Sequence, residues 1–168
     1  MKLYLVRHAL PDYGDWDGSI ATKPDDPPLS DEGKDDVATL AQWILDSGDI
    51  PNLIWASPKL RTQETAEIIR DVLGLPSVDI RGSMGSDMSI RKMVLKAAAD
   101  KDVTRLMLVS HHESIAHGLV NLNGGDPTPH SDIFAMAEMR IVKVKRKTGE
   151  WDECLRLPPS ELGNWDRY

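Results

Sequence analysis

The chain has 168 residues, 40% of them hydrophobic and 28% charged, with a formal net charge of −7. This length suits a single domain with its own core, which we expect to span residues 1–168. The acidic balance argues against nucleic-acid binding, which normally needs excess Lys and Arg. No apolar stretch is long enough to cross a bilayer, so no membrane partner is expected. Cys154 is the only cysteine, and a cytoplasmic protein is the simplest interpretation.

The negative charge is concentrated in one segment. Residues 12–36 contain nine acidic side chains and two lysines, and this excess of seven equals that of the whole chain. The remainder is close to neutral, so a local basic site for an anion is compatible with the acidic total. We interpret residues 12–36 as a solvated, partner-selective lip, in which Trp16 is the candidate for partner contact. Their spacing does not match an EF-hand.

The first elements of the chain carry clear local signals. A buried strand is expected over residues 2–7. A long loop at 10–29 follows it, and loops of this length are usually functional or mobile. Ser30 has the side chain of an N-cap. Apolar residues then recur at helical spacing until Gly48, a residue type typical of helix C-termini.

The alternation of strand and helix continues beyond this point. A short strand is expected at 53–56, and Ser57-Pro58 is expected to open a helix with Pro58 in its first turn. That helix should end at Gly74. Further strands are expected at 78–80, 103–110, 133–145 and 151–156. Helices are expected between them at 87–99 and 113–122. The order predicts an α/β fold, a three-layer sandwich with a mostly parallel central sheet and an antiparallel edge.

Basic and imidazole side chains follow three of these expected strands. Arg7 and His8 end the first strand, Arg61 follows the second on the first turn of a helix, and His111 follows the 103–110 strand. In open α/β sheets, ligands bind beyond the carboxyl ends of the strands. The four side chains should therefore meet at one edge, where helix N-termini add backbone N–H donors.

The chemistry of this set suits a phosphoryl group. Two arginines can bind a tetrahedral dianion through bidentate, charge-assisted hydrogen bonds. Their charge lowers the pKa of an adjacent imidazole and so leaves a ring nitrogen unprotonated, as an attacking histidine requires. Phosphoryl transfer needs mainly positioning, in-line attack and charge neutralisation. His8, Arg7, Arg61 and His111 supply these parts without a metal, and no cofactor is expected.

Several segments resemble the histidine phosphatase (phosphoglycerate mutase-like) superfamily. Arg7-His8-Ala9 is similar to its Arg-His-Gly signature, and Pro28–Gly33, Ser57–Ala66 and Leu108–His111 follow in the family's order. Within the superfamily, the short length and the Ser-His element resemble the SixA-type phosphohistidine phosphatases. The resemblance implies a phosphoglycerate mutase-like fold.

The same resemblance implies roles for individual side chains. It implies that His8 is the nucleophile and becomes phosphorylated, that Arg7 and Arg61 bind the phosphoryl group, and that His111 contacts this group from the other side. The implied substrate is a phosphorylated protein or a small phosphorylated metabolite.

Two departures from the family pattern bear on the substrate. Ala9 replaces the usual glycine, which is tolerated if the residue has no positive φ. The larger family members also carry a glutamate that protonates the leaving oxygen, whereas residues 79–91 contain none, and Asp87 is only a weak substitute. A phosphorylated imidazole is already a good leaving group and needs less acid assistance. The sequence therefore favours phosphohistidine over an alkyl phosphate ester.

Other functions remain open at this stage. The chain could be a phosphoglycerate mutase or small-molecule phosphomonoesterase of the same superfamily, or a non-catalytic binder of phosphate or phosphoprotein. A receiver-like domain is less favoured because Asp25 and Asp26 lie between prolines rather than at strand ends. A zinc-protease motif is also disfavoured, because His112 and His117 are five residues apart, about 140° around a helix. His130 is interpreted as an exposed loop residue.

Overall fold

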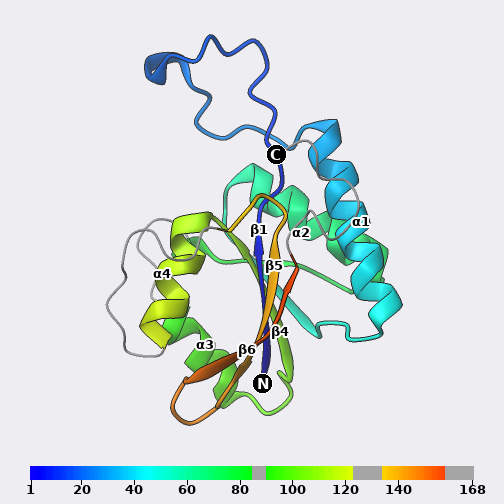
Figure 1. The fold of residues 1–168 in the computed structure, drawn as a ribbon, viewed down its shortest axis with the longest axis vertical. Coiled ribbons are helices and arrows are strands. Elements are labelled where there is room, and N and C mark those ends of the chain that lie inside the picture. Colours follow the sequence, from blue (N-terminus) through cyan, green and yellow to red (C-terminus); the bar gives the residue numbers. More distant parts are fainter. Residues whose placement is uncertain (85–89, 123–133, 158–168) are drawn as a thin grey trace.

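A six-stranded mixed sheet forms the centre of the computed structural model, which describes residues 1–84, 90–122 and 134–157 (Figure 1). The strands are β1 Lys2–Arg7, β2 Leu53–Ala56, β3 Asp79–Ile80, β4 Arg105–Ser110, β5 Met139–Val144 and β6 Trp151–Leu157. Their order across the sheet is β3-β2-β4-β1-β5-β6. The first four in this order pair in parallel, and β5 and β6 are antiparallel. The expected parallel sheet with an antiparallel edge is confirmed.

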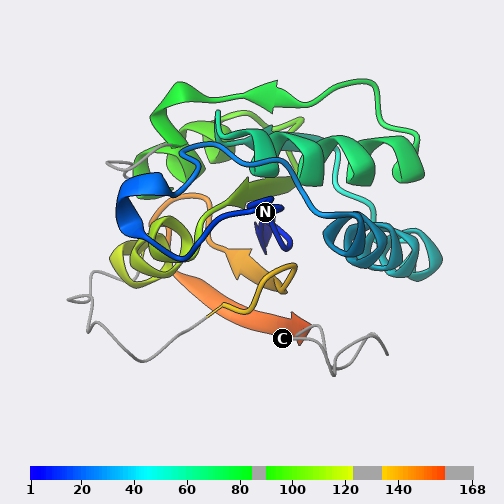
Figure 2. The same cartoon turned by 90° about the horizontal axis from the view of Figure 1, so that it is seen from above.

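Helices cover both faces of the sheet. They are α1 Asp31–Ser47, α2 Leu60–Leu73, α3 Ile90–Ala99 and α4 His112–Leu122, with 3-10 turns η1 Ile20–Thr22 and η2 Gly82–Met84. Figures 1 and 2 show α1 and α2 on one face and α3 and α4 on the other. Each helix pair buries its apolar side against the sheet in its own core cluster. The three-layer sandwich is therefore present. None of the helices in the described part of the chain is long and apolar enough to cross a membrane.

Local signals correctly located α1. The Ser30 hydroxyl accepts a hydrogen bond from the Gly33 N–H at 3.0 Å, and Gly48 ends the helix with φ +68°. Gly33 has a second role, because a Cβ there would lie 2.4 Å from the Leu10 carbonyl oxygen. This oxygen also accepts the Ser30 N–H at 2.9 Å. The start of α1 thus packs closely against the backbone just beyond the end of β1 and is hydrogen-bonded to it.

Among the element boundaries that differ from the predictions, two have a visible cause. The second helix begins at Leu60 rather than at Pro58. The reason is that the Ser57 N–H still donates to Val109 O at 3.1 Å, which keeps the chain extended past β2. The strand expected over 133–145 begins only at Met139, because residues 134–138 form a turn, and residue 133 lies outside the described ranges.

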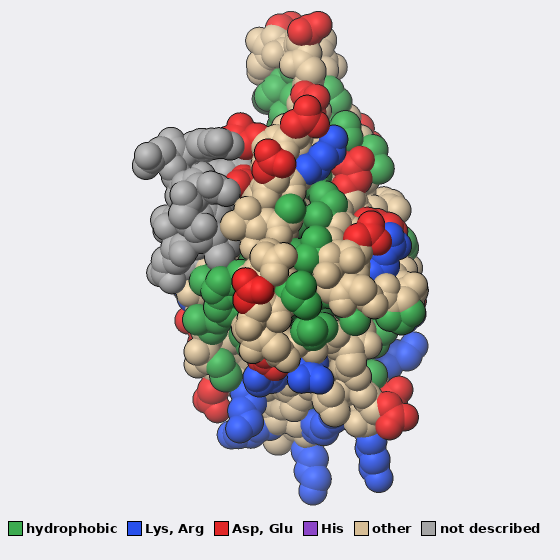
Figure 3. Space-filling model, turned by 90° about the vertical axis from the view of Figure 1, so that its right-hand side faces the viewer, with side chains coloured by type: hydrophobic (Ala, Val, Ile, Leu, Met, Phe, Trp, Pro, Cys, Tyr) green, Lys and Arg blue, Asp and Glu red, His purple; other side chains and the backbone are tan. Residues whose placement is uncertain are grey.

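The long loop at 10–29 leaves the body of the protein at the carboxyl end of β1. Figure 1 shows it projecting beyond the sheet, and an antiparallel bridge between Pro11 and Leu29 closes its base. In Figure 3, acidic side chains occupy this end of the visible face, and Lys and Arg side chains gather at the opposite end. The loop's acidic side chains thus lie at the sheet edge where the predicted site is located.

Candidate active site

The topology brings the four predicted site residues together. Strands β2, β4 and β1 are adjacent and parallel, so their carboxyl ends meet at one edge of the sheet. The rings of His8 and His111 lie edge to face, with centroids 5.2 Å apart and planes inclined at 65°. Arg61 reaches both rings: its Nε lies 3.3 Å from His8 Nε2, and its Nη2 lies 3.4 Å from His111 Nδ1.

The contacts of His8 determine which of its nitrogens carries the proton. His8 Nδ1 lies 2.8 Å from the Ala9 carbonyl oxygen, which can only accept a hydrogen bond. The Arg61 Nε–H donates to Nε2 from the other side of the ring. The neutral ring is therefore protonated at Nδ1 and carries its lone pair on Nε2. This lone pair lies beside the guanidinium group of Arg61.

His111 is neutral for the same kind of reason. An arginine nitrogen can only donate, so His111 Nδ1 accepts from Arg61. The proton is then on Nε2, which donates to the Ser57 hydroxyl at 3.1 Å. Ser57 follows β2 and was not among the predicted site residues. Its position at a strand end, in the segment that carries the family resemblance, was a usable signal.

Both imidazoles have a lowered pKa. Burial lowers the pKa of His8 to about 3, with further lowering by Arg61, while the hydrogen bond to Ala9 acts in the opposite direction. Burial and then Arg61 lower the pKa of His111 to about 4. A desolvated imidazole beside a cation resists protonation. Both rings are thus neutral, with one proton each, at pH values well below 7.

We expect His8 to make the folded state less stable as the pH falls. Its folded pKa lies below the ordinary value of 6.5, so the unfolded chain binds a proton first as the pH falls. Stability should therefore be fully present above about pH 6.5 and decline towards the folded pKa, by at most about 1.4 kcal/mol per pH unit from this group. NMR titration of the ring carbons measures the pKa, and urea unfolding gives the slope. A His8 ring that titrates near 6.5 would contradict this expectation.

Arg7 is held by a turn that lies far along the chain. Its Nη1 donates to the Phe134 carbonyl oxygen at 2.6 Å, and its backbone N–H donates to Glu138 O at 3.1 Å. The Ala137 N–H donates to the carbonyl oxygen of His8 at 3.2 Å. Arg7 Nε is buried and has no hydrogen-bond partner among the described residues. Burial lowers the pKa of the guanidinium group, and its unpaired Nε–H leaves a donor for an anion.

A buried ion pair shapes this turn. Glu138 Oε2 accepts the Ala135 N–H at 2.8 Å, and Oε1 accepts from Arg140 at 2.8 Å and from Arg156 at 3.0 Å. The side chains of Glu138 and Arg140 are each 1% exposed. Sequence reasoning missed this network, although a Glu and an Arg two residues apart in an apolar strand were a visible signal.

Removing the Glu138 carboxylate should destabilise the fold. Glu138→Ala is expected to cost about 3–5 kcal/mol, because it removes the buried carboxylate that accepts from Arg140 Nε. Chemical denaturation measures the loss. The matched control is Glu150→Ala, which removes the exposed pair with Lys145 and should cost under about 1 kcal/mol. Equal losses in the two variants would show that the buried network has no special role.

The acidic loop is attached to the site by two aspartates. Asp25 pairs with Lys59 at 3.1 Å, and Asp26 accepts the Leu60 N–H at 2.7 Å. Asp26 Oδ1 also lies 3.8 Å from Nη1 of Arg61. The loop therefore caps α2 at the point where Arg61 enters the site, which the sequence interpretation as a solvated lip did not foresee.

The other predicted residues have mixed outcomes. Ala9 is buried and has no positive φ, so replacement of the usual glycine is accommodated. Asp87 and His130 lie outside the described residues. His112 accepts the Phe134 N–H at 3.2 Å. Within the described ranges, no three His, Cys, Asp or Glu side chains are grouped to hold a metal ion.

Comparisons with known proteins show which proteins the chain resembles. The family model described as histidine phosphatase superfamily (branch 1) matches residues 3–82. The phosphohistidine phosphatase SixA of Escherichia coli K12 is 23% identical over 155 residues, which is 90% of this chain and 92% of SixA. The solved structure of SixA with tungstate has a TM-score of 0.78 at 20% identity, over 96% of this chain and 99% of that one.

A second solved structure shows that the fold is shared more widely. The mycobacterial glucosyl-3-phosphoglycerate phosphatase has a TM-score of 0.72 at 16% identity, over 94% of this chain and 98% of that one. The family match and the similarity to SixA indicate a phosphatase, that is, a hydrolase. The chain is similar to the histidine phosphatase superfamily, and its similarities within that superfamily include SixA.

Proposed function

We propose that the protein is a metal-independent phosphatase that removes the phosphoryl group from phosphohistidine in a protein, with His8 as the nucleophile. The observation that carries the proposal is the orientation of His8. Its Nδ1–H is bonded to the Ala9 carbonyl, and its Nε2 lone pair faces the site beside Arg61. The similarity to SixA, whose name states this activity, supports the choice of substrate.

The first step transfers the phosphoryl group to the enzyme. Arg7, Arg61 and His111 hold the phosphoryl oxygens, and the lone pair of His8 Nε2 attacks phosphorus in line. The bond from phosphorus to the substrate nitrogen breaks, and its electron pair returns to the leaving imidazole. The guanidinium groups neutralise the charge that the phosphoryl oxygens carry in the transition state.

The second step restores the enzyme. Phosphorylation leaves the Nδ1 proton of His8 in place, still donated to the Ala9 carbonyl, so the phosphorylated ring carries positive charge and is a good leaving group. Water attacks phosphorus, the Nε2–P bond breaks, and inorganic phosphate leaves with a neutral His8. These two steps predict ping-pong kinetics with a phosphoenzyme intermediate.

A small-molecule phosphomonoesterase is the second candidate. It is favoured by the fold shared with a sugar-phosphate phosphatase and by Glu113, whose charge raises the pKa of both Arg7 and His111. A carboxyl group near these two side chains could protonate an ester oxygen.

A substrate panel separates the two candidates. We expect turnover of a phosphohistidine protein to exceed that of phosphate monoesters by at least about 10²-fold, the usual contribution of a general acid. Glu113→Gln should leave the phosphohistidine rate within about twofold, because an imidazole leaves without strong acid help. Faster ester turnover that Glu113→Gln reduces would instead identify a phosphomonoesterase. Phosphate binding without turnover of any substrate would indicate a non-catalytic binder.

A further inference from the structure

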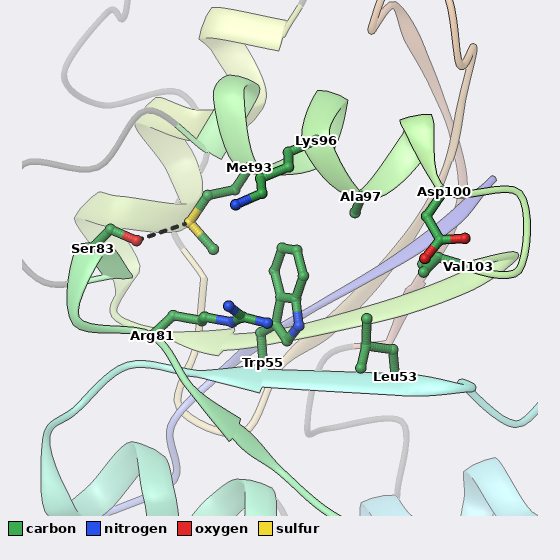
Figure 4. Close-up of a pocket in the computed structure, with 9 residues that line it drawn as sticks. All are labelled: Leu53, Trp55, Arg81, Ser83, Met93, Lys96, Ala97, Asp100 and Val103. Carbon is green, nitrogen blue, oxygen red and sulfur yellow. Dashed lines mark hydrogen bonds between the residues drawn. The ribbon is translucent and has the colours of Figure 1, made fainter.

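A cavity lies under α3, on the sheet face opposite α1 and α2. Its volume is about 280 Å³. Its lining comes from β2, from the segment after β3, from α3 and from the turn that follows α3 (Figure 4), and consists of Leu53, Trp55, Arg81, Ser83, Met93, Lys96, Ala97, Asp100 and Val103. None of the four phosphate-site residues contributes to it. Nothing in the proposed reaction uses this cavity.

Two buried N–H donors at this cavity are unsatisfied. Trp55 is 7% exposed, and its indole Nε1 has no hydrogen-bond partner in the described part of the structure. The same is true of Arg81 Nε. The Arg81 guanidinium stacks on the Trp55 ring at 4.5 Å and donates from Nη2 to Asp79 at 2.6 Å. Buried indole N–H groups normally have a partner, so these donors indicate a missing acceptor.

The charges around the cavity indicate the kind of acceptor. Lys96 forms no ion pair with any described residue, and Figure 4 shows its ammonium group on the same side of the Trp55 ring as Arg81. Asp100 lies at the opposite end, where its Oδ1 accepts the Asp102 N–H at 2.9 Å. The two unsatisfied buried groups are both donors, and one of them belongs to a cationic side chain, to which Lys96 adds a second positive charge. A ligand must therefore supply acceptors and negative charge.

The remaining walls of the cavity indicate that the rest of the ligand is apolar. Leu53, Met93 and Val103 present apolar surface, with the Trp55 ring between the two ends of the cavity. Small-molecule pockets of proteins range from about 300 to 1,000 Å³ and combine apolar walls with a few placed polar groups. This cavity, at about 280 Å³, is slightly smaller than that range, which suits a single planar ring.

We propose that the cavity under α3 binds a small planar organic acid that carries a second hydrogen-bond acceptor. The carboxylate meets Lys96 and Arg81 Nε, the second acceptor takes the Trp55 indole N–H, and the ring lies against the apolar walls. This site is separate from the phosphate site and does not depend on the reaction proposed for His8.

Three probes of similar size test each part of this assignment. Nicotinate has both a carboxylate and a ring-nitrogen acceptor, benzoate lacks the second acceptor, and nicotinamide lacks the charge. The readout is the indole N–H signal of Trp55 in ¹H–¹⁵N spectra, assigned by its disappearance in Trp55→Phe. Nicotinate should shift this signal saturably with a Kd of about 1 mM or lower, and the other two should bind at least about fivefold more weakly.

Matched lysine variants test the charge. Lys96→Met should weaken nicotinate binding by about tenfold, since the carboxylate loses its free cation. Lys101→Met, an exposed lysine just beyond α3, should leave binding within about twofold. Lys96 is exposed, so this variant should fold, and a wild-type-like spectrum verifies it.

Four results would overturn the proposal. They are the absence of a saturable shift up to about 10 mM nicotinate, equal binding of nicotinamide, full binding by Lys96→Met, and displacement of nicotinate by inorganic phosphate. The last result would place the probe at Arg7 and Arg61 instead.

Discussion

Replacing His8 with alanine is expected to lower kcat for a phosphohistidine protein by about 10⁴-fold or more, because the reaction loses its nucleophile. Acid-labile phosphate should then no longer be trapped on the enzyme. His8 is 7% exposed and its ring touches that of His111, so circular dichroism should verify that the variant is folded. Turnover assays and acid-quench trapping with radiolabelled substrate measure the two effects.

His111→Asn is the matched control for this experiment. It removes the second imidazole at the site but leaves His8 in place, so turnover should fall by about 10²-fold, the cost of one oxyanion-type donor. Acid-labile phosphate should still form in this variant. Intact turnover in His8→Ala, or trapped phosphate on a different residue, would refute the assignment of His8 as nucleophile.

Arg61→Lys is expected to lower kcat/KM by about 10²–10³-fold although it conserves the charge. Arg61 reaches His8 through Nε and His111 through Nη2. The single ammonium group of lysine cannot contact both rings and also bind phosphoryl oxygens in a bidentate manner. Steady-state kinetics with the phosphohistidine protein measure the loss.

Arg70→Lys provides the comparison for Arg61→Lys on the same helix. Arg70 lies in the last turn of α2 and forms ion pairs with Glu67 and Asp71, so its replacement should change kcat/KM by less than about twofold. Nearly full activity in Arg61→Lys would mean that only the charge at this position matters, and the proposed two-ring contact would have no catalytic role.

The elements with local signals were the ones that sequence reasoning could locate. Ser30 and Gly48 define the ends of α1 through contacts within a few residues, and Gly74 ends α2 in the same way. Where the outcome depended on distant partners, the prediction was wrong. Pro58 stays outside α2 because Ser57 still pairs with β4. The turn that delays the start of β5 is held by the Ala137 N–H, which donates to the carbonyl oxygen of His8.

The placement of His8, Arg61 and His111 at strand ends could be predicted from the amino-acid order, because parallel strands bring their carboxyl ends to one edge. Their protonation states needed the tertiary structure. Which nitrogen of His8 carries the proton depends on the Ala9 carbonyl and on Arg61, 53 residues away in sequence. Burial sets the low pKa values of His8 and His111, and burial is a property of the packed chain.

The contacts that position Arg7 and the cavity under α3 show most clearly what only the tertiary structure determines. Phe134 contacts Arg7 across 127 residues, and no local periodicity encodes such a contact. The unsatisfied indole of Trp55 becomes visible only when α3 packs over β2. Local sequence determines backbone conformation through caps, turns and hydrophobic spacing. Partners, desolvation and unsatisfied donors arise only when distant segments are brought together.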